Sequence, residues 1–167
     1  MSEPKTLRPR IENLTTNYAG AIYGAIVSMS VIVTTSYDAE LGAGRVAFWS
    51  VLTTAVFWLA HVYMRVVDAG FARPRKSFGV ARRAMRFEWP MVQAALIPAA
   101  VLMLGALDVI SDDTAINLSL WAGVGVLFGA GVLVGKRDGM ETRKCILIGV
   151  INSMIGLLIV FMKIFIH

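Results

Sequence analysis

Five long apolar stretches constrain this chain more than any other feature. They cover approximately residues 18–35, 46–67, 89–109, 116–135 and 145–166. A helix needs about 20 predominantly apolar residues to cross a bilayer core that is about 30 Å thick. The whole composition agrees, since 57% of the residues are hydrophobic, only 16% are charged and the mean hydropathy is +0.68. We therefore expect an all-α, polytopic membrane protein built as a bundle of five transmembrane helices.

The chain divides into a short basic segment and a single transmembrane domain. Residues 1–17 precede the first apolar stretch and include three basic side chains. That stretch is longer than the roughly 7–15 apolar residues of a secretory signal peptide, and no clear cleavage site follows it. Residues 1–17 are accordingly predicted to be a cytoplasmic segment, and residues 18–167 to form one transmembrane helical domain.

Basic residues gather in alternate segments of the chain and predict its orientation. Of the 16 Lys and Arg residues, three lie in the N-terminal segment, seven around the second connection and four in the fourth connection. The remaining segments hold only Arg45 and Lys163. Segments rich in Lys and Arg stay on the cytoplasmic side of a membrane. The N-terminus is therefore expected inside and the C-terminus outside.

The second connection is the longest and the most basic. Phe78, Ala81 and Met85 recur at helical spacing, and the arginines between them lie elsewhere on the helical wheel. This pattern predicts a short amphipathic cytoplasmic helix over 77–87 that lies among the inner headgroups. The alternative is a basic loop that only orients the chain. Six basic residues are the expected contacts with anionic lipid: Arg73, Arg75, Lys76, Arg82, Arg83 and Arg86.

The second apolar stretch carries a polar stripe along one face. At about 100° per residue, eight residues fall together on this face: Ser50, Thr53, Thr54, Phe57, His61, Met64, Arg65 and Asp68. Polar side chains in hydrocarbon turn toward protein or water. The stripe is therefore expected to face a helix contact or a water path.

His61 is the centre of a predicted polar cluster in the inner half of the membrane. Three polar residues on other stretches fall at a similar depth: Tyr23, Gln93 and Asn152. Two roles stay open for His61. It forms a structural hydrogen bond to a carbonyl or to Tyr23, or it titrates near neutral pH in a wetted vestibule.

Small residues recur at helical spacing on the first, fourth and fifth stretches. They are expected to let helices pack closely, within one chain or between subunits: Gly20, Gly24, Gly125, Gly129, Gly131, Gly135, Gly149, Ser153 and Gly156. The fourth stretch contains two Gly-xxx-Gly pairs that point in different directions. We expect that helix to be contacted closely on two sides.

Catalytic and cofactor motifs are absent from the sequence. One cysteine and two histidines cannot supply an all-histidine zinc site, and there is no P-loop, Gly-x-Ser-x-Gly or Cys-x-x-Cys motif. No carboxylate is expected deep within a span, which disfavours a proton-coupled carrier. We expect no enzyme, no metal and no cofactor. The net charge of +5 is assigned to contacts with the anionic inner leaflet, and no nucleic acid is expected.

The segment FWLAHVY at residues 57–63, with the basic loop after it, resembles helices in uncharacterised bacterial multi-pass membrane proteins. The resemblance covers about one span of the five. It implies a bacterial inner membrane and no particular activity.

Three functional hypotheses follow. The first is a homo-oligomer in which the second span lines a narrow pore for ions or protons, with Phe57 as an apolar constriction that gates by dewetting. In that pore His61 would respond to protons, and Arg65 and Asp68 would form the inner mouth. The second is a non-conducting interaction or scaffold protein that binds anionic lipid or a partner. The third is a lipid-headgroup enzyme, which needs a cleft joining His61 to the arginines of the second connection.

Overall fold

The computed structural model describes residues 18–38, 40–69 and 74–166, and all the regular secondary structure in these residues is helical. The five helices are α1 (Tyr18–Thr35), α2 (Ala43–Asp68), α3 (Pro74–Ala106), α4 (Asp112–Arg137) and α5 (Thr142–Ile166). Each is long enough and apolar enough to cross a membrane. This confirms the predicted all-helical architecture with five candidate spans. The predicted cytoplasmic segment, residues 1–17, lies outside the described residues.

The third helix differs most from its prediction. It begins at Pro74 rather than near Trp89, and it ends at Ala106. Residues 77–87 are therefore the first turns of α3 and not a separate short helix. Apart from Gly79, this segment contains no helix breaker, and its Ala, Arg and Met residues favour helix. The helix also continues through Pro90, a residue type that is more often found in the first turn of a helix.

A short connection that ends in a serine N-cap joins α3 to α4. Ser111 is the N-cap of α4, and its side chain accepts a hydrogen bond from the Thr114 amide at 3.4 Å. Asp112 and Asp113 occupy the first turn, where the helix dipole favours negative charge. The connection therefore ends one helix and starts the next within a few residues.

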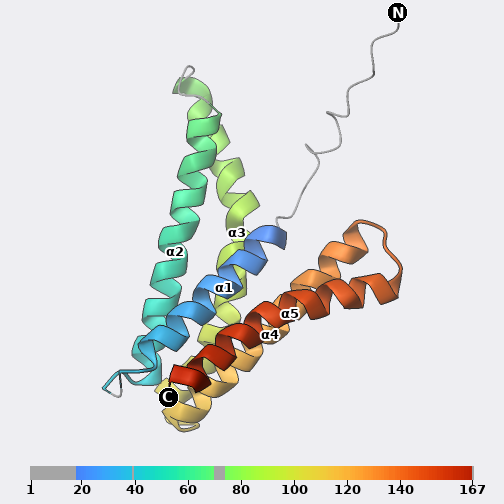
Figure 1. The fold of residues 1–167 in the computed structure, drawn as a ribbon. Helices are drawn as coiled ribbons and strands as arrows, with labels where there is room; N and C mark the ends of the chain where they lie inside the picture. The colour runs from blue at the N-terminus through green and yellow to red at the C-terminus, as the bar shows by residue number, and fades with distance from the viewer. Residues whose placement is uncertain (1–17, 39, 70–73, 167) are drawn as a thin grey trace, which may run out of the picture.

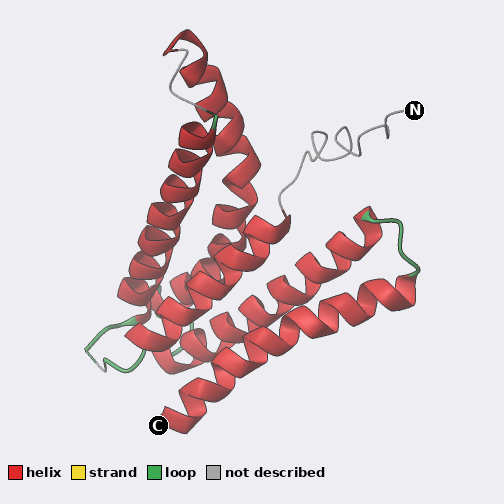
Figure 2. Ribbon diagram, turned by 45° about the horizontal axis from the view of Figure 1, so that its top comes forward, coloured by secondary structure: helices red, strands yellow, loops and turns green. Residues whose placement is uncertain are grey.

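Two helical hairpins and one intervening helix make up the bundle (Figure 1). α2 packs mainly against α3, α4 packs mainly against α5, and α1 contacts all four other helices. The hairpins converge at the end that carries the α1–α2 and α3–α4 connections. Figure 2 shows them diverging toward the other end, which carries the α2–α3 and α4–α5 connections. We call these the converging end and the diverging end.

The main buried core sits toward the converging end. It draws on the second half of α1, the first half of α2, the second half of α3 and the first half of α4, with Met29, Val46, Leu102 and Leu120 as central members. Many large apolar side chains on the outer faces of the helices are exposed, above all along α5. Such a surface suits lipid and is unusual for a protein in water. Away from this core, the hairpins leave room between them.

Candidate functional site

Two hydroxyls of the α2 stripe are used inside the chain. Ser50 and Thr54 are 0% and 1% exposed. The Ser50 Oγ lies 2.8 Å from the Oγ of Ser28 on α1, and Thr54 Oγ1 donates to the backbone oxygen of Ser50 at 2.9 Å. Thr53 is half-buried. Ser50 therefore joins α2 to α1, and neither Ser50 nor Thr54 meets solvent in a single chain.

His61 lies in a small cluster with aromatic rings of α1 and α2. Its ring centroid is 5.2 Å from that of Tyr23, and the Tyr23 centroid is 5.9 Å from that of Phe57. His61 Nδ1 donates to the backbone oxygen of Phe57 at 2.9 Å, which leaves Nε2 as the acceptor in the neutral ring. Tyr23 and Phe57 are 37% and 39% exposed. The cluster therefore lies at the surface of the contact between α1 and α2.

An ion pair joins α2 to α3 through a residue that the sequence pattern did not single out. Nε of Arg65 donates to Oε1 of Glu88, and the guanidinium carbon lies 4.1 Å from the centroid of the Phe87 ring. Glu88 lies in the first half of the candidate span Phe78–Ala106 and is buried against α2. Asp68, the other predicted mouth residue, is exposed at the end of α2.

Arg65 itself is the signal that could have revealed this pair. A guanidinium within a span needs a counter-charge or a path to water. The apolar stretch was predicted to begin at Trp89, one residue after Glu88, so the carboxylate was assigned to the connection. Because the helix starts earlier than predicted, Glu88 instead faces α2.

The predicted cluster of four polar residues does not form. Gln93 lies on α3 beside a groove formed with α1 and α4. Asn152 donates from Nδ2 to the backbone oxygen of Ile148 at 3.1 Å, beside Gly131 where α4 and α5 meet. Of the three predicted partners, Tyr23 is the one whose ring contacts His61. Equal depth in a membrane does not place side chains on facing helix surfaces, because each helix has its own rotation.

Most of the predicted small residues lie at helix contacts. A Cβ added to Gly24 would come within 2.1 Å of the Met91 backbone oxygen on α3, and one added to Gly135 within 2.8 Å of the Cα of Cys145 on α5. Four others are likewise buried: Gly20, Gly131, Gly149 and Gly156. Ser153 is half-buried and donates to the backbone of its own helix. Small side chains thus bring α1 against α3 and α4 against α5.

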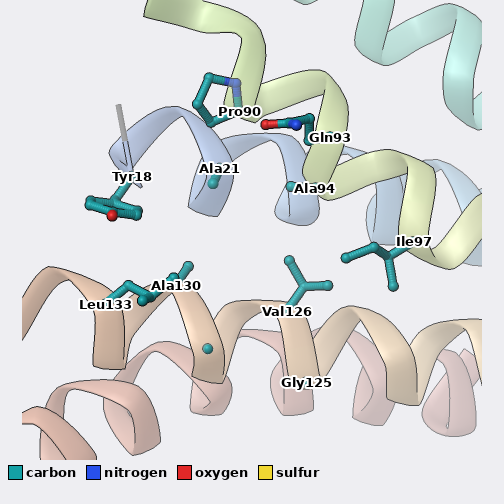
Figure 3. Close-up of a pocket in the computed structure, with 11 residues that line it drawn as sticks. Tyr18, Ala21, Pro90, Gln93, Ala94, Ile97, Gly125, Val126, Ala130 and Leu133 are labelled. Carbon is teal, nitrogen blue, oxygen red and sulfur yellow. The ribbon is translucent and has the colours of Figure 1, made fainter. Parts of the chain in front are cut away.

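Gly125 and Gly129 are different, because they line an open groove between α1, α3 and α4 (Figure 3). A Cβ added to either glycine would meet no atom within 4 Å. The groove has a volume of about 500 Å³. Its walls are apolar, with side chains such as Ile97, except for the phenol of Tyr18 and the amide of Gln93. In Figure 3, side chains of α4 face those of α1 across this space.

The register of the α2–α3 hairpin leaves part of α3 beyond the end of α2. Arg65 lies three residues before the end of α2 at Asp68, whereas its partner Glu88 lies fourteen residues after the start of α3 at Pro74. The difference of about eleven residues corresponds to about 16 Å of helix. Figure 2 shows these first turns of α3 reaching past α2.

This projection carries exposed basic side chains. Arg82 and Arg83 lie along it and Arg86 lies at its base, and all three are exposed. Within the described residues, none of the three makes an ion pair. The other predicted lipid contacts of this segment fall outside what the structure describes, namely the whole of Arg73 and the side chains of Arg75 and Lys76. The diverging end of the bundle is thus strongly basic on its α3 side.

Comparison of the chain with models of protein families, with curated proteins and with solved structures finds no match. The resemblance of residues 57–63 to bacterial inner-membrane helices accordingly stays a prediction. The groove, the ion pair and the basic projection are the features from which a function is inferred.

Proposed function

We propose that this chain is a non-catalytic, multi-pass protein of a bacterial inner membrane that binds anionic phospholipid at its basic end. Five apolar helices supply the membrane domain. The most basic connections lie at the diverging end, and the positive-inside rule assigns that end to the cytoplasm and the C-terminus to the outside. The resemblance of residues 57–63 supports the choice of a bacterial membrane.

The projecting start of α3 is the observation that carries this proposal. Arg82, Arg83 and Arg86 are exposed there, so their guanidinium groups are available to lipid phosphates. Phe78, near the tip, is 83% exposed. Each basic residue near an anionic leaflet contributes about 1 kcal/mol. Three such residues amount to an affinity gain of about 100-fold.

Lipid titration of the purified full-length chain tests this function. Native mass spectrometry in detergent would measure the Kd for phosphatidylglycerol and for phosphatidylcholine with identical acyl chains. We expect tighter binding of phosphatidylglycerol and a loss of up to about 100-fold in the variant R82Q/R83Q/R86Q. Arg45→Gln, a basic residue at the converging end, is the matched control and should bind like the natural chain. Equal binding of the two lipids, or an unaffected triple variant, would contradict the proposal.

A pore between copies of the chain is the competing proposal. It depends on a second copy, because Ser50 and Thr54 are buried against helices of their own chain. The half-exposed rings of Tyr23 and Phe57, with His61 between them and the inner end of α2, supply a surface for such a copy. Proton flux into liposomes that falls in Phe57→Ala and His61→Ala variants, together with an oligomer in detergent, would favour the pore over the lipid-binding protein.

A lipid-headgroup enzyme requires His61 to act beside the arginines of α3. The ring contacts of His61 are with Tyr23, whereas Arg86 lines a separate hollow with Trp58, Met85 and Trp89. These separate surroundings support a binding role rather than a catalytic one.

A further inference from the structure

We infer that the groove between α1, α3 and α4 holds one acyl chain of the anionic phospholipid whose headgroup the basic residues bind. This inference rests on the proposed function and adds to it a defined binding site for one acyl chain. Diffuse attraction to an anionic leaflet needs only surface charge. A two-part site needs in addition an apolar groove, a place for it to open, and positive charge at that opening.

The walls of the groove suit a hydrocarbon chain. Its volume of about 500 Å³ falls within the range of about 300–1,000 Å³ for ligand pockets. Apolar side chains such as Ile97, Val126 and Leu133 line it, and among the described residues Tyr18 and Gln93 are its polar side chains. A charged or strongly hydrogen-bonding ligand would find few partners along this length, whereas an acyl chain needs none.

The glycines of α4 leave the groove open. Gly125 and Gly129 lie one turn apart on one face of the helix, and a Cβ added to either would meet nothing within 4 Å. The second pair of the same helix, Gly131 and Gly135, is in close contact with α5. The chain therefore uses one Gly-xxx-Gly pair for its own packing and leaves the other vacant, with room for an external occupant.

Positive charge continues the α3 wall of the groove toward the diverging end. Residues seven apart share a helix face. Arg83 precedes Pro90 by seven residues and Arg86 precedes Gln93 by seven, and both later residues line the groove. Arg83 therefore extends that wall in the direction of the α2–α3 connection, whereas Arg86 lies beside Trp58 of α2. Both side chains are exposed.

The α4 wall ends in positive charge as well. Lys136 follows Gly129 by seven residues and Leu133 by three, so that it shares their face, and it is exposed. Tyr18 and Leu133 lie at the same end of the groove in Figure 3. This end therefore opens between basic side chains on α3 and α4, which selects a phosphate-bearing headgroup.

The same charge disfavours the two other occupants that the geometry admits. A second copy of this chain in the same orientation would bring a second basic end beside the first. The N-terminal residues 1–17 carry Lys5, Arg8 and Arg10 against only two acidic side chains. Like charges repel across a low-dielectric surface, whereas the phosphodiester of a phospholipid is attracted.

Comparing lipids of different acyl-chain length distinguishes binding in the groove from attraction by surface charge alone. This comparison uses only the natural protein. Native mass spectrometry of the full-length chain in detergent would compare phosphatidylglycerol with oleoyl chains and phosphatidylglycerol with hexanoyl chains. A filled groove makes the long-chain lipid bind at least about fivefold more tightly, because the long chain gains packing contacts. Equal affinity for the two lipids would overturn the inference.

Filling the groove is the second test. Gly129→Leu and Gly125→Leu place a side chain in open space, and leucine favours helix more than glycine does, so both variants should fold. We expect either one to remove the dependence on chain length and to weaken long-chain phosphatidylglycerol about fivefold. Ala60→Leu, an exposed helical position of α2 outside the groove, is the control and should bind normally.

The outcomes separate the groove from the function on which it rests. If R82Q/R83Q/R86Q weakens binding while Gly129→Leu and Gly125→Leu do not, the protein binds anionic lipid by charge alone and the acyl-chain seat is wrong. If the arginine variant binds normally, the proposed function itself fails. If the natural chain is an oligomer and Gly129→Leu makes it dissociate, the groove is occupied by a second copy of the chain, and acyl-chain binding there is refuted.

Discussion

Breaking the Arg65–Glu88 ion pair should destabilise the bundle by an amount that depends on which partner is removed. The Glu88 side chain is 2% exposed and that of Arg65 is 46% exposed. In Glu88→Gln the guanidinium loses its counter-charge but can turn toward water or lipid phosphate, so we expect a loss of about 1 kcal/mol. Arg65→Met instead leaves a buried carboxylate without its cation, which costs about 3 kcal/mol.

Unfolding of the purified chain in mixed micelles by increasing SDS measures these free energies. The fluorescence of Trp58 and Trp89, whose rings lie 6.2 Å apart between α2 and α3, reports on this hairpin. The double variant R65M/E88L should recover most of the loss seen in Arg65→Met, because it leaves no buried charge. Arg45→Met removes an arginine at the other end of the bundle and should change little.

Two results would refute this reasoning. Equal losses in Arg65→Met and Glu88→Gln would show that the unequal exposure of the partners does not decide the energetics. A double variant no more stable than Arg65→Met would show that the loss comes from missing packing around Phe87 rather than from removal of the cation beside the carboxylate.

Five further substitutions, in three sets, test individual helices. SDS unfolding is the measurement for the first two sets, the glycine pair and the serine pair. Gly24→Ala should lower the free energy of unfolding by about 2 kcal/mol, since its Cβ would lie 2.1 Å from an α3 backbone oxygen. Gly125→Ala should leave the stability unchanged or raise it by up to about 1 kcal/mol. Equal changes of stability in the two variants would contradict the helix contacts. Ser50→Ala should cost about 0.6–1 kcal/mol through the lost hydrogen bond to Ser28, and Ser28→Ala should cost the same if that bond is the cause. Ser111→Ala should cost about 1 kcal/mol and speed hydrogen exchange of the first amides of α4, and unchanged exchange would show that the cap is dispensable.

The helical architecture could be predicted because hydrocarbon accepts so few chain conformations. Backbone polar groups must pair within the span, so a stretch of about 20 apolar residues is almost sufficient to identify a helix. The stretch 18–35 matches α1 residue for residue. The start of α3 was placed wrongly, because hydropathy reports where a chain is apolar and not where it is helical. Arg82, Arg83 and Arg86 lower the hydropathy while favouring helix.

The candidate site was harder to predict, because it depends on helix rotation. Ser50 and Thr54 of the α2 stripe are buried, whereas Met64 and Asp68 of the same stripe are exposed. The bonded residues of the stripe have separate partners in α1, α2 and α3. Ser50 reaches Ser28, His61 bonds its own helix and contacts Tyr23, and Arg65 pairs with Glu88. Periodicity along one helix gives the face of a residue, and it contains no information on which helix lies opposite.

The two Gly-xxx-Gly pairs of α4 also show that spacing along one helix does not identify what lies opposite. Both pairs have equal spacing in the sequence, yet one packs on α5 and the other lines an open groove. In water an apolar groove of this kind would be costly and would favour closure of the hairpins. In a bilayer, lipid acyl chains are as apolar as the side chains that line the groove, so closure gains little. Filling the groove with hydrocarbon is therefore expected for any lipid, and selection among lipids has to come from its opening. The exposed arginines of α3 and Lys136 of α4 can select among lipids only if an acyl chain in the groove keeps the headgroup beside them. Acyl-chain length and headgroup charge must therefore be varied together.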